Sequence, residues 1–331
     1  MWRIAGHEEA VTFLEKSIEK DMLSHAYLLI GPSQVGKMTL AMNLACAVNC
    51  LESRSSSPCG ECTQCYRIFA GQHPDIQIIK TEAGSRTINL EQVRDIQHSA
   101  MFKPYEGKYR VFIFEEASSL NDEASNNILK LLEEPPESVL FILLTSQWQS
   151  ILPTISSRCH WIRLNTLATG TITEEIQRVF DIPSEEAEGM ARLSNGRIGW
   201  ALNASGDPKI MKDYIASLDR MSSILNDNLE DKFAYAEEMA ALYLKDRNKA
   251  FEQLNTAVSW WRDLMVLKNG DREFVSNMSA LESLDYHATW VSSSQMVESI
   301  NNILETIDYM EANVNPRLAL ECLMLSLPRR R

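Results

Sequence analysis

The sequence predicts an α/β domain built on a doubly wound, mostly parallel sheet, followed by an all-helical second half. Three observations lead to this prediction. Short apolar runs alternate with helical patterns up to about residue 165, a glycine-rich loop follows the first run, and strand signals vanish after Thr166. Strands that alternate with helices are typical of parallel sheets whose two faces are covered by helices.

Five apolar runs are expected to form the strands. The first, Ala26–Ile30, is continuous and ends at Gly31, as is typical of a strand buried on both faces. Helical patterns lie between the runs, and Pro135-Pro136 stops the last of these helices. The predicted strands are 26–30, 76–79, 111–114, 140–144 and 161–164, and the predicted helices between them are 37–50, 89–100 and 121–134.

The rest of the chain reads as helices. Thr171 and Glu174 have the spacing of a capping box, and a second helix is expected over 184–193. Asp207-Pro208 and Asn315-Pro316 each offer an N-cap with proline at the first helical position. We therefore expect a nucleotide-binding core over 1–165 with a cysteine module at about 50–70, a small helical domain over 166–207, and an all-helical domain over 208–331.

The glycine-rich loop has the pattern G-x-x-x-x-G-K, from Gly31 to Lys37. Between a strand and a helix, backbone N–H groups of such a loop cradle phosphate and the lysine adds a charge; a structural turn is the alternative. The next residue should carry a hydroxyl for Mg²⁺, but Met38 offers only a thioether, a poor ligand for that ion. Thr39 does not simply substitute, because one further residue turns its side chain by about 100° around the helix.

The strand over 111–114 ends in two carboxylates, where phosphate-loop enzymes hold their metal. Glu115 stands where Asp is usual and is one methylene too long for a site built around Asp. Glu116 stands where a carboxylate polarises the attacking water, and a solvated strand end is the alternative for the pair. Mg²⁺ binding is thus impaired at two positions, and we do not expect ATP hydrolysis by this chain.

Four of the seven cysteines have the spacing C-x8-C-x2-C-x2-C. Two-residue gaps let thiolates converge on one ion, and four thiolates close a tetrahedral Zn²⁺ site with no open position for catalysis. Unliganded cysteines and an iron–sulfur cluster are the alternatives. Cys46 is the rival ligand, but its place on an apolar helix face favours a buried structural role. The predicted structural zinc ligands are Cys50, Cys59, Cys62 and Cys65.

Composition and charge restrict the classes of function. No apolar run among the 331 residues reaches the ~18 that a spanning helix needs, and the N-terminus lacks a secretory apolar segment, so we expect a cytoplasmic protein with no membrane partner. The net charge of -13 makes the chain a poor stand-alone DNA binder, because Lys and Arg supply most non-specific affinity. Work on nucleic acid is therefore expected inside an assembly, or through a local basic patch such as Arg329–Arg331.

Several segments together resemble a bacterial DNA polymerase III clamp-loader subunit of the AAA+ family, over nearly the whole chain. The resemblance implies an AAA+ module, a small helical lid and a collar domain that holds the complex together. It also implies partners: gamma/tau and delta subunits, and, through the complex, a sliding clamp that is loaded on primed DNA during replication. The matching segments are the phosphate loop, the cysteines, His25–Pro32, His73–Asp75, Pro104–Lys108, Leu131–Pro136, Leu152–Cys159 and Asn313–Leu318.

The resemblance also assigns roles to single residues. It implies that Arg158 is an arginine finger on a neighbouring subunit's ATP, where a guanidinium stabilises charge on the transferring phosphoryl group. An ordinary salt-bridged arginine is the alternative. Thr145 falls at the sensor-1 position. Trp200 stands where the lid of an active ATPase carries its sensor-2 arginine, and Arg197 is nearby but out of register.

The departures at Met38, Glu115 and Trp200 favour a delta-prime type of subunit, which does not hydrolyse ATP and offers its finger to the next subunit. ATP or ADP could still sit in the site without turnover, with Mg²⁺ binding impaired. The residues expected to bind the nucleotide and its metal are Gly31, Gly36, Lys37, Thr39 and Glu115.

Two alternatives remain open. An active gamma/tau-like ATPase is favoured by the presence of Gly36, Lys37 and Glu116. A zinc-containing DNA recombination or repair ATPase is a third class. The acidic charge opposes that class, as does the position of the cysteines after the phosphate loop rather than before it.

Overall fold

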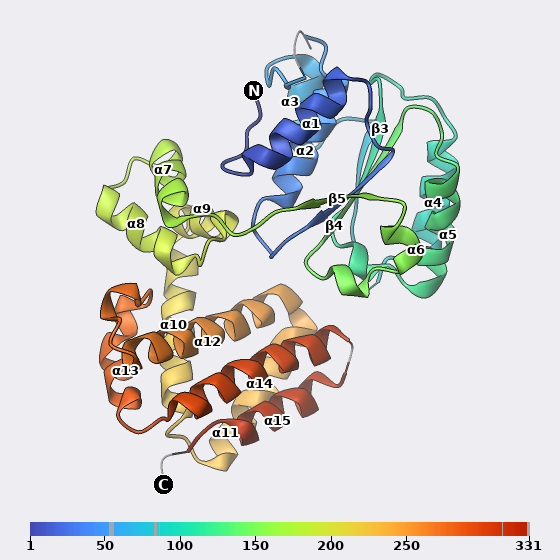
Figure 1. The fold of residues 1–331 in the computed structure, drawn as a ribbon. Helices are drawn as coiled ribbons and strands as arrows, with labels where there is room; N and C mark the ends of the chain where they lie inside the picture. The colour runs from blue at the N-terminus through green and yellow to red at the C-terminus, as the bar shows by residue number, and fades with distance from the viewer. Residues whose placement is uncertain (53–55, 83–84, 86, 313, 330–331) are drawn as a thin grey trace. The chain divides into compact units, whose positions relative to one another are not determined.

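The computed structural model describes residues 1–52, 56–82, 85, 87–312 and 314–329. Two residue sets that the sequence singles out, Asn313 and Arg330-Arg331, lie outside this part of the chain. The chain forms two compact units, Met1–Leu202 and Asn203–Arg331. Figure 1 shows the sheet and its helices in the first unit and helices alone in the second.

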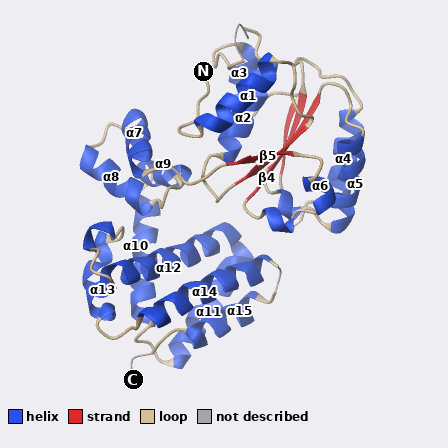
Figure 2. Ribbon diagram, viewed as in Figure 1, coloured by secondary structure: helices blue, strands red, loops and turns tan. Residues whose placement is uncertain are grey.

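A five-stranded parallel sheet forms the centre of the first unit (Figures 1 and 2). The strand order is β2-β3-β4-β1-β5, and each pair of neighbours runs in parallel. The structure thus confirms the predicted fold class, and it confirms each of the five predicted strands to within one residue at every end. The strands are β1 (Ala26–Ile30), β2 (Ile76–Ile79), β3 (Arg110–Phe114), β4 (Val139–Thr145) and β5 (His160–Arg163).

Helices cover both faces of this sheet because its central strands are apolar on both sides. Alternate residues of β1 enter different cores: Tyr27 and Leu29 pack with one group of helices, whereas Leu28 packs with the other. One face is covered by α1 (Glu8–Glu19), α2 (Lys37–Asn49) and α3 (Thr63–Phe69). The other face is covered by α4 (Leu90–Ala100), α5 (Asp122–Glu133) and α6 (Pro153–Ser156), with short 3-10 turns η1 (Ala117–Ser119) and η2 (Trp148–Ser150) beside them.

Three helices follow the sheet: α7 (Thr169–Val179), α8 (Ser184–Leu193) and α9 (Ile198–Gly206). They share a small core that includes Ile172, Ile176 and Ala187. The predicted capping box at Thr171 is wrong, because the first helix begins at Thr169 and its N-cap residue makes no side-chain cap. Burial of Ile172 and Ile176 on one face fixes this helix more strongly than a local cap would.

The second unit is all-helical within its described residues, as the absence of strand patterns predicts. Its interior holds Trp260 and Trp261, both fully buried. Asp207 and Asn315 cap helices that begin with proline, which confirms both predicted starts. The helices are α10 (Pro208–Ile224), α11 (Leu229–Lys245), α12 (Arg247–Lys268), α13 (Leu281–Ala288), α14 (Ser293–Glu311) and α15 (Pro316–Ser326), with 3-10 turns η3 (Arg272–Phe274) and η4 (Met278–Ala280).

Candidate functional site

The phosphate loop connects the carboxyl end of β1 to the first turn of α2. Gly31 leaves no room for a side chain, because a Cβ there would lie 2.3 Å from the carbonyl oxygen of Leu164. Gly36 is the N-cap residue of α2 and has a φ of 111°, a conformation that glycine adopts readily. No side chain caps this helix, so its first N–H groups are left for an anion.

Lys37 is buried at the bottom of the loop. Its Nζ donates to the carbonyl oxygens of Gly31, at 2.5 Å, and Pro32, at 2.9 Å. Burial lowers the pKa of Lys37 to about 8, and the nearby Glu116 carboxylate opposes that shift. The lysine thus bonds to the loop's own oxygens, and a phosphate would have to compete with them.

The two residues after Lys37 lie in different surroundings. Met38 packs against the apolar core formed with α1, α2 and α3. Thr39 is exposed on the helix surface, and its carbonyl oxygen accepts a bond from Asn43 Nδ2 at 2.8 Å. The position that should supply a hydroxyl to Mg²⁺ therefore holds a half-buried thioether that packs against the core.

The carboxyl ends of β3 and β4 bring the other predicted residues to the same edge of the sheet. Glu115 is exposed, whereas Glu116 is half-buried and its Oε1 accepts a bond from Ser118 Oγ at 2.7 Å. Thr145 is fully buried, and its carbonyl oxygen accepts the Gly31 N–H at 3.1 Å. The sensor-1 candidate is thus bonded directly to the start of the phosphate loop.

The small helical domain touches the loop through a close backbone contact. The N–H of Gly199 donates to the Gln34 carbonyl at 2.8 Å, and a Cβ on Gly199 would lie 2.9 Å from the same oxygen. The next residue, Trp200, is buried at 4% exposure. Arg197 donates from Nε to the Ser194 carbonyl at 3.0 Å, at the end of α8. The predicted sensor-2 position therefore holds a buried indole.

Arg158 follows α6 at the start of β5. Its Nη2 lies 2.7 Å from Glu133 Oε1, and its Nη1 donates to the Thr154 carbonyl at 2.8 Å. Both charged side chains are partly exposed, at 35% and 51% of their surface. A pair this exposed to water contributes little, at most about 1 kcal/mol, and is readily exchanged for a stronger anion. The structure thus places the candidate finger on the surface, with Glu133 as its partner within this chain.

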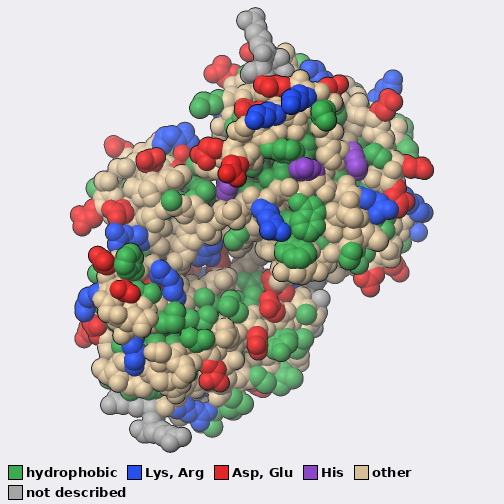
Figure 3. Space-filling model, in the orientation of Figure 1, with side chains coloured by type: hydrophobic (Ala, Val, Ile, Leu, Met, Phe, Trp, Pro, Cys, Tyr) green, Lys and Arg blue, Asp and Glu red, His purple; other side chains and the backbone are tan. Residues whose placement is uncertain are grey.

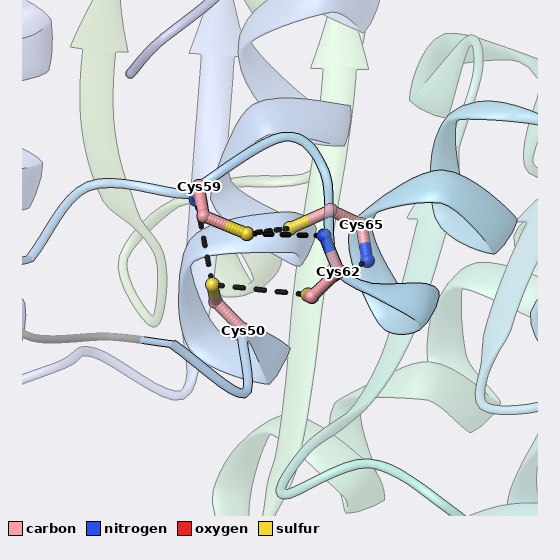
Figure 4. Close-up of side chains that lie close together, drawn as sticks. All are labelled: Cys50, Cys59, Cys62 and Cys65. Atoms are coloured by element: carbon pink, nitrogen blue, oxygen red, sulfur yellow. Dashed lines mark hydrogen bonds between the residues drawn. The ribbon is translucent and has the colours of Figure 1, made fainter.

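The four predicted ligand cysteines converge (Figure 4). Cys50 follows the last residue of α2, and the other three lie in and around the start of α3. All four sulfur atoms lie within 4.8 Å of one another, and the pairs Cys50–Cys62 and Cys59–Cys65 are each 4.0 Å apart. Four thiolates at the usual zinc–sulfur bond length lie about 3.8 Å apart, so the arrangement fits a tetrahedral metal site. A disulfide is excluded at this separation.

Backbone N–H groups point at these sulfur atoms. Cys59 Sγ accepts from the N–H groups of Glu61, at 3.4 Å, and Cys62, at 3.2 Å, and these bonds lower the pKa of Cys59 to about 7. Burial raises the pKa of Cys50 and of Cys65. Cys46 is fully buried beside the cluster, with its Sγ 3.9 Å from the Cys65 carbonyl oxygen. The N–H groups therefore favour a thiolate at Cys59, whereas burial at Cys50 and Cys65 opposes the thiolate unless a cation compensates it.

Sequence reasoning missed two features that hold this region together. The first is Asp75, whose buried carboxylate accepts N–H groups from residues 105–107 and a guanidinium N–H from Arg110. The segment His73–Asp75 enters the sequence analysis only through the resemblance, which assigns Asp75 no role. The second is the N-terminal segment, where Arg3 and His7 bond to other parts of the first unit. Neither feature has a local spacing pattern, because their partners are distant in sequence.

The charges on the face drawn in Figure 3 are mixed in sign. On the face drawn in Figure 3, Lys and Arg side chains stand singly or in small groups among acidic ones. This fits the net charge of -13. Within the described residues, no helix is both long and apolar enough to cross a membrane.

Comparison with known proteins identifies the family. Residues 6–168 match the family model described as DNA polymerase III, delta subunit. The DNA polymerase III subunit delta' of Bacillus subtilis is 27% identical over 314 residues, which cover 95% of this chain and 94% of that protein. The chain belongs to the DNA polymerase III clamp-loader family. It is a clamp-loader subunit with an AAA+ fold, as the resemblance of its segments predicts.

The chain is also similar to a tau/gamma subunit and to a solved gamma subunit-related structure. The tau/gamma subunit of Haemophilus influenzae is 32% identical over 244 residues, which cover 70% of this chain but 35% of that protein. The crystal structure of a gamma subunit-related protein from Thermotoga maritima covers 95% of this chain at 18% identity, with a TM-score of 0.43.

Proposed function

We propose that this chain is a delta-prime-type clamp-loader subunit that does not hydrolyse ATP itself. It assembles with gamma/tau and delta subunits in the cytoplasm, and the complex loads a sliding clamp on primed DNA. Its contribution to catalysis is Arg158, supplied to the ATP of a neighbouring subunit. The single observation that best supports this proposal is Met38, a half-buried thioether packed against the core at the position where a Mg²⁺-binding hydroxyl is required.

Two further observations support it. The sensor-2 position holds the buried Trp200 instead of an arginine. Arg158 is held at the surface by a partner that a phosphate can displace. The domain division in this proposal is a core over 1–165, a lid over 166–207 and a collar over 208–331. Thr145 and Glu116 would still lie in the nucleotide site, but they would take part in no hydrolysis step.

We further propose that the phosphate loop retains ATP or ADP without turnover. The backbone cradle and Lys37 are intact, and Lys37 Nζ would exchange the carbonyl oxygens of Gly31 and Pro32 for a phosphate oxygen. Mg²⁺ would be held weakly, because Met38 and Glu115 replace its usual ligands.

The cysteine cluster would hold a structural zinc ion. The ligand set of four thiolates, the sulfur spacing and the absence of an open position all fit this role. Zinc supplies local folding free energy in such a module, and the chain supplies the N–H groups that stabilise thiolates.

One assay tests the role in catalysis. The complete clamp loader is reconstituted with clamp and primed DNA, and its ATP turnover is compared for Lys37→Ala and Arg158→Ala in this chain. Arg158→Ala should reduce turnover at the adjoining site by at least about tenfold, because an arginine finger supplies charge in the transition state. Lys37→Ala should leave turnover nearly unchanged.

A second candidate, an active gamma/tau-like ATPase, is favoured by the 32% identity to a tau/gamma subunit and by the intact Lys37. It predicts the reverse result, with turnover lost in Lys37→Ala. That outcome would contradict the delta-prime proposal. Glu133→Gln serves as a control for surface changes near the finger, since it removes the partner of Arg158 but leaves the guanidinium in place.

A further inference from the structure

The first residues of the chain connect the two functional modules of the first unit. We propose that residues 2–7, here called the strap, couple the cysteine module to the phosphate loop, with Arg3 and His7 as its two positioning residues. The strap is fixed at its start by Trp2, which is 8% exposed and lies in the same apolar core as Leu44 and Cys65.

Arg3 attaches the strap to the cysteine module. Its Nη2 donates to the carbonyl oxygen of Gly60 at 2.9 Å, and its guanidinium lies 5.0 Å from the centre of the Phe69 ring. Gly60 has a φ of 79° and lies between the ligand residues Cys59 and Cys62. The guanidinium therefore contacts the turn that places two of the four sulfur atoms.

The middle of the strap is bonded to α2. The backbone N–H of Arg3 donates to Asn43 Oδ1 at 2.7 Å, and Asn43 Nδ2 donates back to the Arg3 carbonyl at 3.3 Å. Asn43 is fully buried. An amide that pairs with both backbone groups of one residue fixes the direction of the strap along the helix.

His7 attaches the strap to the phosphate loop. Its Nε2 donates to the Val35 carbonyl at 3.0 Å. A Cβ placed on Gly36 would lie 3.8 Å from Ile4 Cδ1 and 3.9 Å from His7 Nε2, so the strap lies directly on the last glycine of the loop. Helix α2 has no side-chain cap, and Ile4 and His7 of the strap lie beside its N-cap residue, Gly36.

Coupling of this kind is reciprocal, so a change in order at one end of the strap should change the order at the other end. A metal bound by the cysteines would restrict the backbone at Gly60. Through the strap, that restriction would also limit the motion of Val35 and Gly36, which gives the cysteine module a role beyond its own fold. This inference does not require that nucleotide is hydrolysed or that Arg158 acts as a finger.

Hydrogen exchange of the full-length chain, followed by mass spectrometry, tests this inference without nucleotide. Arg3→Ala should raise amide exchange in residues 31–37 by roughly three- to tenfold, as expected when one or two hydrogen bonds are lost. Arg3→Lys keeps a cation over Phe69 but loses the guanidinium geometry, and should have a smaller effect. His7→Ala should raise exchange at residues 59–62, at the far end of the strap.

Arg67→Ala is the matched control, because Arg67 also lies in the cysteine module but pairs with Glu106 instead of the strap. It should leave exchange in residues 31–37 unchanged. The inference is overturned if Arg3→Ala leaves the phosphate loop as in the wild type. It is also overturned if Arg3→Ala raises exchange equally in β3 and β4, since that pattern would indicate general destabilisation.

Discussion

Replacing Cys65 with serine is expected to abolish zinc retention and to lower the midpoint of thermal unfolding by roughly 10 °C. Cys65 is fully buried and belongs both to the cysteine cluster and to the apolar core that covers one face of the sheet. A structural zinc ion contributes to folding directly, so a change of ligand affects the core as well as the module. Elemental analysis and thermal denaturation measure the two effects.

Cys46→Ser is the matched control for this change. Cys46 is equally buried and lies next to Cys65, but it is not one of the four converging cysteines. The Cys46→Ser variant should be somewhat less stable than the wild type but should still bind about one zinc ion per chain. A wild-type chain that is well folded and contains no metal would contradict the zinc assignment.

Zinc retention should also weaken as the pH falls. Burial raises the pKa of Cys65 and of Cys50, so these thiols hold their protons when no metal is present. Metal binding must release those protons, and a higher proton concentration therefore opposes it. Zinc content measured after dialysis at a series of pH values tests this direction.

Asp75→Asn is expected to destabilise the first unit by about 3–5 kcal/mol, because it breaks a buried ion pair and leaves buried donors without a partner. The wild-type Oδ1 accepts the Tyr105 N–H at 2.7 Å, and Oδ2 accepts the N–H groups of Glu106 and Gly107 at 2.8 and 2.9 Å. Arg110 Nη2 lies 3.2 Å from Oδ1. Chemical denaturation of the two proteins measures the difference.

The stability that the Asp75 carboxylate contributes should also depend on pH. Burial raises the pKa of Asp75, but the three backbone N–H groups and Arg110 outweigh it, so the net pKa is lowered. A lowered folded-state pKa contributes stability above the unfolded value of about 3.9, and that stability is lost as the pH falls through the folded value. The stability difference between wild type and Asp75→Asn should therefore shrink below about pH 4.

Glu106→Gln is the control for this position, since Glu106 pairs with the exposed side chain of Arg67. It should cost about 1 kcal/mol or less. An Asp75→Asn variant as stable as the wild type at pH 7 would mean that the loop over 105–107 is held by other contacts.

The strands were predictable because each is a short apolar run with helices on both sides. The Ala26–Ile30 run, for example, divides its side chains between two cores, and only a strand covered on both faces does so. The phosphate loop and the cysteines were predictable because their spacing is local. These patterns need no knowledge of distant contacts.

Other features escaped prediction for physical reasons. Helix α1 has a left-handed N-cap residue, His7, and no side-chain cap, so it lacks the usual N-cap signal and has only the acidic residues Glu8 and Glu9 in its first turn. Helix α3 is only seven residues long and is capped by the sulfur of Cys62, which sequence rules do not treat as a cap. Asp75 and Arg3 act through partners thirty or more positions away. The capping-box pattern at Thr171 was outweighed by the packing of Ile172 and Ile176.

Helix α2 begins at Lys37, in the phosphate cradle, and ends just before Cys50, in the metal cluster. Inserting or deleting one residue within it would turn Cys50 by about 100° and shift it by about 1.5 Å relative to the loop. The described residues between Cys50 and Cys59 form no helix, so a change of length there would not rotate one cysteine relative to the other in this way. Natural variation in length among clamp-loader subunits should therefore accumulate between the first two cysteines and be absent from residues 37–50.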